Sequence, residues 1–380
     1  RLRFGDREEA FWSDYFNGIR SENRWVSHVP AGQRPRKREQ IEILGIEVGH
    51  WYEPIGLGRR FMARFGDISR IDSSGQNVRV TLKSGAVFDV DRFSANDLDN
   101  GVRVWDGTRG AVDLDGKAIR TIQFLPTPTL GEVPRRLHGT VRTRQGEFSG
   151  FIRWDRDECV GSDQLDGRTA TGELSVPFDS IRSIARQSRD SSLVTLLDGR
   201  EIALSGTREV GHQNRGIYVD DVRYGRVVIS AAAFERIDFS SPAGSGPAYG
   251  EFPAGRALTG IVTTRAGRRL AGRLVYDLDE SETAEVLDSA SQGVEYAIPF
   301  GLIASLTPCG REERGASRAK VVLHAGEELQ CDCAPELGEA NAGMLIFVDG
   351  HPRPQYVPWG DVREVHFDRP AMMYPPIGVR

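Results

Sequence analysis

Three acidic segments carry the side chains best suited to bind a metal ion. They begin Asp155-Arg156-Asp157, Asp277-Leu278-Asp279 and Asp97-Leu98-Asp99, and an Asp-x-Asp start is typical of calcium-binding loops. None of them continues into a twelve-residue loop with glycine at position six and glutamate at position twelve. We therefore interpret them as solvated loops that keep the protein soluble, with calcium binding as the alternative, and we predict no metal ligands.

The four cysteines allow a disulfide, a zinc site or buried thiols. Cys331-Asp332-Cys333 lies on one expected strand, where both thiols can face the same side, and Cys309 is nearby in sequence. A zinc site would need four ligands at suitable spacing. Besides these cysteines, His324 is the residue of a zinc-ligating type that lies close in sequence. We expect buried thiols or, in an exported protein, a disulfide between Cys309 and either Cys331 or Cys333.

Sequence motifs for catalysis are absent. The chain has no Gly-x-Ser-x-Gly, no His-Glu-x-x-His and no phosphate loop ending in Gly-Lys-Ser/Thr, and Gly56-Leu57-Gly58 is too short for a dinucleotide-binding fingerprint. The seven histidines do not recur at equivalent positions of the repeats described next. Because a site built once per repeat would leave a repeated residue, we predict a non-enzymatic protein without catalytic residues or a cofactor.

A set of six apolar and glycine positions recurs three times along the chain. The second copy is Phe178, Ile181, Ile184, Gly199, Gly216 and Phe239; the third is Phe300, Ile303, Leu306, Gly326, Gly343 and Phe367; the first is Phe65, Ile68, Ile71, Gly85, Gly101 and Phe124. From first to last phenylalanine, these copies span 61, 67 and 59 residues. Such similar spacings predict tandem repeats of about 110 residues.

Short β-branched and aliphatic runs separated by glycine turns predict strands. The clearest is Leu193 to Leu204, whose two runs meet at Asp198-Gly199, a dipeptide that tolerates the positive φ of a tight hairpin. Gly139 to Gly150 repeats this pattern, and Val176 to Ile184 gives an apolar pair, a turn and a last strand. Five short strands per half-repeat match a small closed barrel, which has no free sheet edge. The expected fold is all-β, with three tandem repeats that each contain a pair of five-stranded barrels.

Composition places the boundaries between these repeats. The expected segments are repeat one (1–125, with an insertion at 19–64), a stiff proline-rich linker (126–134), repeat two (135–239), a looser linker with Gly and Ser (240–255), repeat three (256–368) and an extended C-terminal tail (369–380). Prolines exclude a helix or a central strand in the tail. Three pairs of barrels in a row would form an elongated, rigid body with little cleft.

Repeat one differs from the others at its start. Residues 6–18 align without gaps with 155–167, but the hairpin at 139–150 has no counterpart in repeat one. The first barrel would therefore lack its first strand, and an open sheet edge favours aggregation. We expect the edge to be filled by an upstream part of a longer protein, which could include an export signal or lipid anchor, or by another segment. Phe11 and Trp12 follow in a stretch expected to form one or two helical turns.

Aromatic, basic and apolar residues outside the repeat pattern are the candidate partner contacts. Aromatic side chains dominate interface hot spots, and basic clusters bind acidic protein faces or anionic lipid headgroups. The alternative is that the early aromatic residues cover the incomplete barrel and that the basic run is solvated. The candidates are Trp12, Tyr15, Arg34, Arg36, Lys37, Arg38, Trp51, Tyr52, Met372, Met373, Tyr374 and Ile377.

Composition also restricts the class of partner. The chain has 380 residues, and 49 Lys and Arg against 54 Asp and Glu give a formal charge of −5, which disfavours general nucleic-acid binding. No apolar run approaches the roughly 18 residues of a membrane-spanning helix. The length suits two to four domains, roughly one per 100–200 residues.

Two segments resemble known families of small barrels. Val176 to Ile184 is similar to the end of SH3-like barrels, particularly the PRC-barrel family, and Val194 to Leu204 resembles the first hairpin of Sm-like barrels. The resemblance implies a binding or scaffolding module without catalytic residues. PRC barrels occur in the H subunit of photosynthetic reaction centres and in an RNA-processing factor, which implies an accessory role in a large complex. Sm-like RNA binding is the alternative, and the acidic balance of the chain opposes it.

We therefore predict a non-enzymatic scaffold or accessory subunit that binds protein subunits of a larger complex. Its expected location is periplasmic or extracellular, on the surface of a membrane-bound assembly. No nucleic acid, small-molecule substrate or cofactor is expected. The alternative function is a ligand-binding protein or hydrolase with a single site in one repeat.

Overall fold

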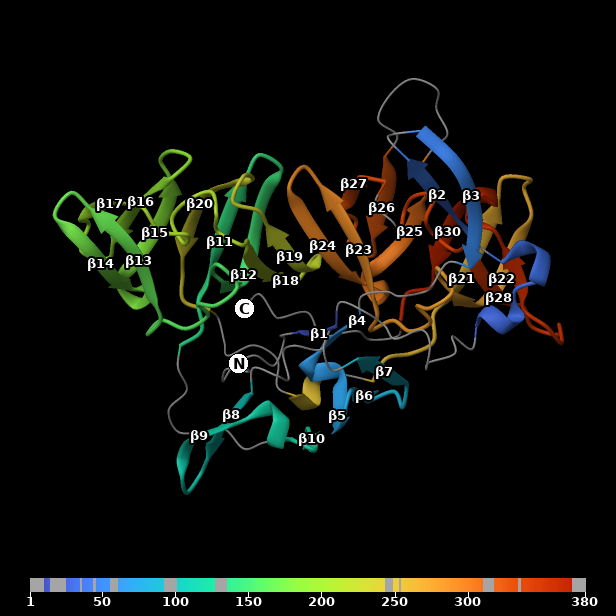
Figure 1. Ribbon diagram of the computed structural model, residues 1–380, viewed down its shortest axis with the longest axis horizontal. Helices are drawn as coiled ribbons and strands as arrows, with labels where there is room; N and C mark the ends of the chain where they lie inside the picture. Colours follow the sequence, from blue (N-terminus) through green and yellow to red (C-terminus); the bar gives the residue numbers. More distant parts are fainter. Residues whose placement is uncertain are drawn as a thin grey trace.

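The computed structural model consists of antiparallel strands joined by turns and three-residue 3-10 helices, so the all-β prediction is confirmed. It describes residues 10–13, 25–34, 36–43, 46–54, 61–91, 101–126, 135–242, 249–252, 254–309, 318–333 and 336–370. Figure 1 shows repeats two (green) and three (orange to red) side by side, with most of repeat one below them. The three repeats therefore do not lie in a row.

Repeat two contains the following strands. They are β11 (His138–Thr143), β12 (Gly146–Arg153), β13 (Gln164–Thr169), β14 (Gly172–Pro177), β15 (Ile181–Arg186), β16 (Ser191–Leu196), β17 (Glu201–Ser205), β18 (Ile217–Asp221), β19 (Gly225–Ile229) and β20 (Phe234–Phe239). The hairpin expected between Leu193 and Leu204 is confirmed, since Val194 of β16 lies opposite Ile202 of β17. A 3-10 helix, Phe178–Ser180, provides the expected turn before β15.

The two halves of repeat two exchange hairpins. β11 and β12 of the first half pair with β20 and β18 of the second half. The other hairpin of the first half, β13–β14, pairs instead with β17, where Arg168 lies opposite Ser205. Two five-stranded groups result, β14-β13-β17-β16-β15 and β20-β11-β12-β18-β19, and the pairing of β15 with β20 joins them.

The expected pair of closed barrels is not confirmed. Within the described strands, the sheet order of repeat two runs from β14 to β19 without closing on itself. Sequence periodicity identifies which residues are extended, because side chains alternate along a strand. Which strands pair with each other depends on contacts between residues far apart in the sequence. β20, for example, pairs with β11 along one edge and with β15 along the other.

Repeat three contains a second set of strands in the same order. They are β21 (Thr259–Thr264), β22 (Arg269–Val275), β23 (Val286–Ser291), β24 (Val294–Pro299), β25 (Ile303–Thr307), β26 (Ala319–Leu323), β27 (Glu328–Cys331), β28 (Met344–Phe347), β29 (Gln355–Val357) and β30 (Val362–Phe367). One sheet has the order β27-β26-β25-β30-β21-β22-β28-β29. The hairpin β23–β24 pairs with β19 and so extends the sheet of repeat two to twelve strands.

Repeats two and three therefore share both a sheet and a core. β19 pairs with β24 from Arg226 opposite Ala297 to Ile229 opposite Val294. The rings of Phe148, Tyr224 and Tyr296 meet edge to face at this junction, with centroids 5.8 to 6.0 Å apart. One continuous cluster of buried side chains extends through both repeats. This junction makes the two repeats one body.

Repeat one forms smaller sheets. Its strands are β1 (Ala10–Ser13), β2 (Arg36–Ile43), β3 (Ile46–Pro54), β4 (Phe61–Arg64), β5 (Ile68–Ser74), β6 (Asn77–Leu82), β7 (Val87–Asp91), β8 (Val102–Asp106), β9 (Gly110–Leu114) and β10 (Thr121–Gln123). They form one four-stranded sheet, β10-β5-β6-β7, and the two-stranded sheets β1-β4, β2-β3 and β8-β9. The helical turns expected at Phe11 and Trp12 are wrong, because both residues pair with β4 in a strand that suits aromatic residues.

Part of the insertion in repeat one docks on repeat three. Trp25 and Val29 are buried in an apolar cluster with Val275, Leu278 and Leu345. The guanidinium of Arg273 lies 5.3 Å from the Trp25 ring centroid, within the range of a cation–π contact. The insertion is therefore anchored at one end by the burial of a large aromatic side chain.

The second linker is also anchored where it is described. Tyr249 donates a hydrogen bond from its hydroxyl to the carbonyl of Ile68 at 2.9 Å, and its ring stacks on Phe124. The Lys83 ammonium donates to the carbonyls of Tyr249 and Phe252 and lies 3.6 Å from the Tyr249 ring centroid. Burial lowers the pKa of Lys83. The expected looseness of this linker therefore does not apply to residues 249–252.

Close packing of strand backbones in repeat two gives a first prediction. A Cβ atom at Gly150 would lie 2.0 Å from the carbonyl oxygen of Asp220, whereas Gly107 has no heavy atom within 4 Å of the same position. We expect Gly150→Ala to lower the free energy of unfolding by about 1–3 kcal/mol, because β12 and β18 would have to separate. Gly107→Ala should change it by less than about 0.5 kcal/mol. Urea denaturation of both variants tests this, and equal midpoints would contradict it.

Candidate functional site

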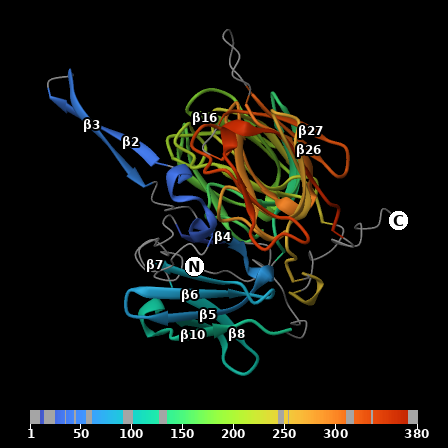
Figure 2. The ribbon, with the colours of Figure 1, turned by 90° about the vertical axis from the view of Figure 1, so that its right-hand side faces the viewer.

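The insertion of repeat one forms a two-stranded arm, β2–β3. The strands pair from Arg36 opposite Pro54 to Ile43 opposite Ile46, which also places Arg38 opposite Tyr52. Neither strand pairs with any other strand in the described part of the chain. Figure 2 shows the arm extending away from the body of the molecule.

The arm brings together five of the twelve predicted contact residues. These are Arg36, Lys37, Arg38, Trp51 and Tyr52. Arg34 lies two residues before β2, and its Nε donates to the carbonyl of Val29 at 3.4 Å. Trp12 lies on β1 and is not part of the arm. The remaining candidates, Tyr15, Met372, Met373, Tyr374 and Ile377, lie outside the described residues.

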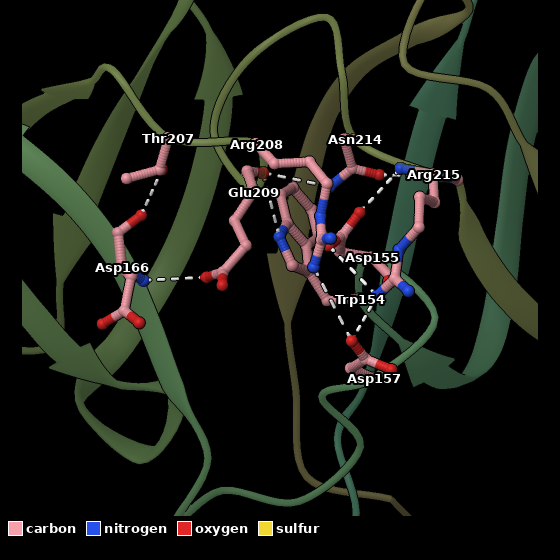
Figure 3. A network of polar contacts seen from close by, with 10 residues as sticks. Trp154, Asp155, Asp157, Asp166, Thr207, Arg208, Glu209, Asn214 and Arg215 are labelled. Atoms are coloured by element: carbon pink, nitrogen blue, oxygen red, sulfur yellow. Dashed lines mark hydrogen bonds and ion pairs between the residues drawn. The ribbon is translucent and has the colours of Figure 1, made fainter.

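The acidic segment at Asp155 belongs to an internal polar network (Figure 3). Asp155 is buried, and its carboxylate accepts hydrogen bonds from Arg208 Nε at 2.7 Å and from the Arg215 backbone N–H at 2.6 Å. The Arg215 guanidinium also donates to Asp157. Asp277 is buried as well, and it accepts the Ala342 backbone N–H. The interpretation as solvated loops is therefore wrong for Asp155 and Asp277.

The chain turns in the same way at both buried aspartates. Asp155 and Arg156 have φ angles of 47° and 66°, and Asp277 and Leu278 have φ angles of 49° and 64°. Left-handed backbone is uncommon in residues other than glycine and is stabilised by its surroundings. The buried carboxylate bonds to a distant loop and thereby supports the turn. The third acidic segment, 97–99, lies outside the described residues.

Glu209 and Asn214 form the other half of the network. The Glu209 carboxylate accepts the backbone N–H of Asp166 at 2.8 Å. The Glu209 carbonyl accepts Trp154 Nε1–H at 3.1 Å and the Asn214 side-chain amide at 3.0 Å. Figure 3 shows these side chains converging from separate loops and strands. The contacts fasten the loop after β17 to β13 on one side and to the end of β12 on the other.

Repeat three forms the same contacts with its own residues. The Glu336 carboxylate accepts the backbone N–H of Asp288 at 2.9 Å. The Glu336 carbonyl accepts the Tyr276 hydroxyl at 2.6 Å and the Asn341 amide at 2.7 Å. The network therefore occurs in both repeats, and the hydrogen bonds named here join residues of the same chain. We interpret it as a structural element that holds the exchanged hairpins in place.

Sequence reasoning missed this element although its signal is present. Glu209-Val210-Gly211 is followed by Asn214 and Gly216, and Glu336-Leu337-Gly338 is followed by Asn341 and Gly343 at the same spacing. This motif joins one carboxylate to one amide and so differs from the acidic pairs and catalytic motifs of known sites. Its Asn side chains also accept the backbone N–H of Gly216 and Gly343.

Glu158 next to this network is a perturbed carboxyl group. Desolvation, followed by the nearby Glu209 carboxylate, raises the pKa of Glu158 to about 8. Burial likewise raises the pKa of Glu209. One Glu158 carboxylate oxygen is buried without a hydrogen-bond partner among the described residues. Glu209 also lines a small cavity of about 20 Å³ together with Ser188 and Ser192.

The cysteines form one disulfide and two buried thiols. Cys309 bonds to Cys333, with 6.0 Å between their Cα atoms, and Cys159 and Cys331 are buried outside it. The sequence allows Cys309 to pair with either Cys331 or Cys333, and in the structure it pairs with Cys333. In the described part of the chain, no three His, Cys, Asp or Glu side chains are grouped to hold a metal ion. Because Cys309 and Cys333 are bonded to each other, neither sulfur is a thiolate that could ligate zinc in this structure.

A cleft of about 400 Å³ lies at the junction of repeats two and three. Arg144, Gln145 and Glu147 come from β12 and the turn before it, and Arg223 and Tyr224 from the turn before β19. Repeat three contributes Gln292, Tyr296, Arg318, Glu328 and Gln330. The Gln145 side-chain amide donates to the carbonyl of Ser291 and so links the two walls.

The cleft is lined mainly by arginine, glutamate, amide and tyrosine side chains. Its described lining contains no His, Cys or Lys. Burial raises the pKa of Tyr224 and of Tyr296, so both phenols stay protonated at neutral pH and act as hydrogen-bond donors or acceptors. Arg223 is held by the buried carboxylate of Asp221 at 2.6 Å. The cleft therefore offers fixed polar groups without an activated nucleophile.

Comparison of the chain with protein-family models and with curated protein sequences gives no match. In the described part of the chain every helix is a three-residue 3-10 helix, and none could cross a membrane.

The raised pKa of Glu158 predicts a pH-dependent stability difference. The folded-state pKa of about 8 exceeds the ordinary value of 4.5, so the folded protein binds the proton more tightly and loses stability as pH rises from 4.5 to 8. Glu158→Gln removes this titration. We expect its melting temperature to exceed that of the unsubstituted protein increasingly across this window.

Glu173, whose side chain is 81% exposed, supplies the control for this measurement. Glu173→Gln should show the same difference from the unsubstituted protein at pH 4.5 and at pH 8. A Glu158→Gln difference that is likewise constant with pH would contradict the assignment of a raised pKa to this carboxyl group.

Proposed function

We propose that this protein is a non-enzymatic scaffold that binds other proteins through the β2–β3 arm. The observation that carries the proposal is the isolation of the arm. Its strands, of eight and nine residues, pair only with each other within the described structure. A lone two-stranded hairpin is marginally stable in water. A partner that covers one face of the arm or extends one of its edges would supply the missing stabilisation.

The arm sequence suits a protein partner. Arg36, Lys37 and Arg38 begin one strand, and Trp51 and Tyr52 lie toward the end of the other. Arginine and large aromatic residues contribute most to binding energy at protein interfaces. The combination favours a partner surface that is acidic next to an apolar patch.

The rest of the molecule supports this function as a rigid base. Repeats two and three share a sheet and a core, and residues 25–34 anchor the insertion on repeat three. The cleft at the junction lies between repeats and has no nucleophile-base pair in its described lining. These features support a scaffold over a hydrolase with a site in one repeat.

The same proposal places the protein in an oxidising compartment, on the surface of a membrane-bound assembly. The Cys309–Cys333 disulfide supports export, because disulfides persist in the periplasm and outside the cell and are rare in the cytosol. The resemblance of Val176 to Ile184 to PRC barrels supports an accessory role in such an assembly.

Substitution of the arm tests the scaffold function. In the full-length tagged protein, Arg36, Lys37 and Arg38 are changed to Ser, and Trp51 and Tyr52 are changed to Ser in a second variant. We expect each variant to lose at least about 90% of the subunits that co-purify from the native source, since tenfold corresponds to about 1.4 kcal/mol of binding energy. Quantitative mass spectrometry of the purified complex measures the loss.

A matched charge control uses Arg79, Arg168 and Arg200, which lie outside the arm and whose side chains are 58%, 61% and 73% exposed. Changing all three to Ser removes the same charge and should leave the co-purifying subunits unchanged. Full retention of partners by both arm variants would exclude the arm as the binding site.

Thiol labelling tests the proposed compartment. Protein isolated from its native source, denatured and alkylated without reductant should gain two alkyl groups, at Cys159 and Cys331, because Cys309 and Cys333 are bonded. Reduction before alkylation should raise the number to four. Four alkyl groups without reduction would place the native protein in a reducing compartment and contradict export.

A further inference from the structure

The cleft between repeats two and three, which we call the junction cleft, has walls from both repeats. Repeat two supplies one wall, from the turn before β12 and the turn before β19, and repeat three supplies the other, from the β23–β24 turn, the residue before β26 and β27. Its volume of about 400 Å³ falls within the roughly 300–1,000 Å³ of small-molecule sites, which occur preferentially at boundaries between packed units. The position and the size of the cleft therefore suit a small ligand.

Part of the cleft lining is fixed by contacts across the junction. The Gln145 side-chain amide donates to the carbonyl of Ser291, and the buried Tyr296 donates from its hydroxyl to Gln145 Oε1 at 3.4 Å. The rings of Phe148 and Tyr224 pack edge to face on each other and on the Tyr296 ring. Because these contacts form without a ligand, this part of the cleft is preformed.

Three charged groups of the lining already have partners outside it. The Glu147 carboxylate lies 3.0 Å from Arg142 Nε, and the Glu328 carboxylate lies 2.8 Å from Lys320 Nζ. The Arg223 guanidinium is paired with a buried aspartate at 2.6 Å. A charged ligand would have to compete with these ion pairs, whereas a neutral ligand leaves them intact.

The other charged residues of the lining are Arg144 and Arg318. The Arg144 side chain is 90% exposed and lies 3.7 Å from a Glu235 carboxylate oxygen, and Arg318 is exposed as well. Exposed charges are hydrated and screened by salt, so a ligand does not have to neutralise them. Both guanidinium groups can still donate hydrogen bonds to a neutral acceptor.

Three neutral polar side chains of the lining are available for a ligand. The Tyr224 hydroxyl and the amides of Gln292 and Gln330 form no hydrogen bond to another described residue. Amides and phenols both donate and accept hydrogen bonds, as sugar hydroxyls do. The Tyr224 ring adds an apolar surface beside these groups, which suits the C–H face of a sugar ring.

We propose that the junction cleft binds a neutral saccharide of one or two sugar units. Its hydroxyls bond to Gln292, Gln330 and the Tyr224 hydroxyl, and its apolar face packs on the Tyr224 ring. The saccharide joins residues of both repeats, so the site is complete only where the two repeats share their sheet. This binding function goes beyond the scaffold function of the arm and does not depend on it.

Four disaccharides serve as probes of the site. The full 380-residue chain is titrated separately with maltose, cellobiose, lactose and diacetylchitobiose, and saturation-transfer NMR measures binding. We expect at least one of them to bind, with the same affinity at about 50 mM and about 500 mM NaCl, because a neutral ligand has no charge attraction for salt to screen. Inorganic phosphate and malonate, the anionic probes, should not displace the bound sugar.

The hexasaccharide of the bound sugar distinguishes a free disaccharide from the end of a polysaccharide. An affinity equal to that of the disaccharide assigns the cleft to a small free saccharide. An affinity at least about tenfold higher assigns it to a polysaccharide, because sugar units beyond the cleft then add contacts.

Substitutions in the lining assign binding to the cleft. Gln292→Ala combined with Gln330→Ala removes two amides and should weaken binding of the sugar at least about fivefold, since two hydrogen bonds to the ligand are lost. Tyr224→Phe keeps the ring and should weaken binding at least about twofold. The matched control is Gln187→Ala combined with Gln213→Ala, because both glutamines are exposed and lie outside the cleft lining. This control should leave the affinity unchanged.

Several outcomes would overturn the proposal. They are no saturation transfer to any of the four disaccharides, displacement of the sugar by phosphate or malonate, an affinity that falls with salt, or equal affinity of the lining variants. Unchanged thermal unfolding of these variants excludes a folding defect. The arm variant Arg36→Ser, Lys37→Ser, Arg38→Ser should bind the sugar like the unsubstituted chain, so failure of the scaffold function and failure of the saccharide site are distinguishable.

Discussion

Pairing of strands that are distant in sequence is the constraint on which this structure depends. In repeat two, β20 follows β11 by almost a hundred residues, and yet its two edges hold β11 and β15 together. The same principle operates between repeats, where β24 completes a sheet that begins in repeat two. In repeat two, one five-stranded group consists of the consecutive strands β13 to β17, whereas the other combines β11 and β12 with β18, β19 and β20, which follow that group in the chain. Glycines such as Gly139 and Gly150 permit the close backbone approach that these long-range pairs require.

Polar groups inside the protein stabilise this exchange of hairpins. Asp155 forms an ion pair with Arg208 and accepts the backbone N–H of Arg215, and the Glu209 carbonyl accepts hydrogen bonds from Trp154 and Asn214. Buried polar groups are costly unless they are satisfied, and satisfied networks fix one arrangement of the elements that contribute to them. The repeated Glu and Asn positions therefore have a structural explanation, which leaves the uncovered surfaces of the fold as the candidates for binding.

Those surfaces are concentrated in repeat one. Trp25 fastens the insertion to repeat three, and Tyr249 and Phe252 of the second linker fasten the four-stranded sheet of repeat one to the rest of the chain. Between these anchors, the arm β2–β3 and the strands β8 and β10 have edges that no described strand pairs. The strands of repeats two and three that occupy the positions of β8 and β10, namely β18, β20, β28 and β30, pair along both edges. This contrast supports the proposal that repeat one is the protein-binding part of the chain.

The sequence by itself determined the all-β class and hairpins such as the one between Leu193 and Leu204, because alternating apolar residues and Gly turns act locally. It also left Cys309 with two alternative disulfide partners, one of which the structure contains. It could not determine the exchange of hairpins, the sheet shared by β19 and β24, or the anchoring of Trp25. Those depend on which of several chemically similar edges and apolar faces meet in space. Tertiary structure likewise decided that Asp155 is buried and paired, since nothing in its neighbours along the chain reveals that Arg208 and Arg215 return to it.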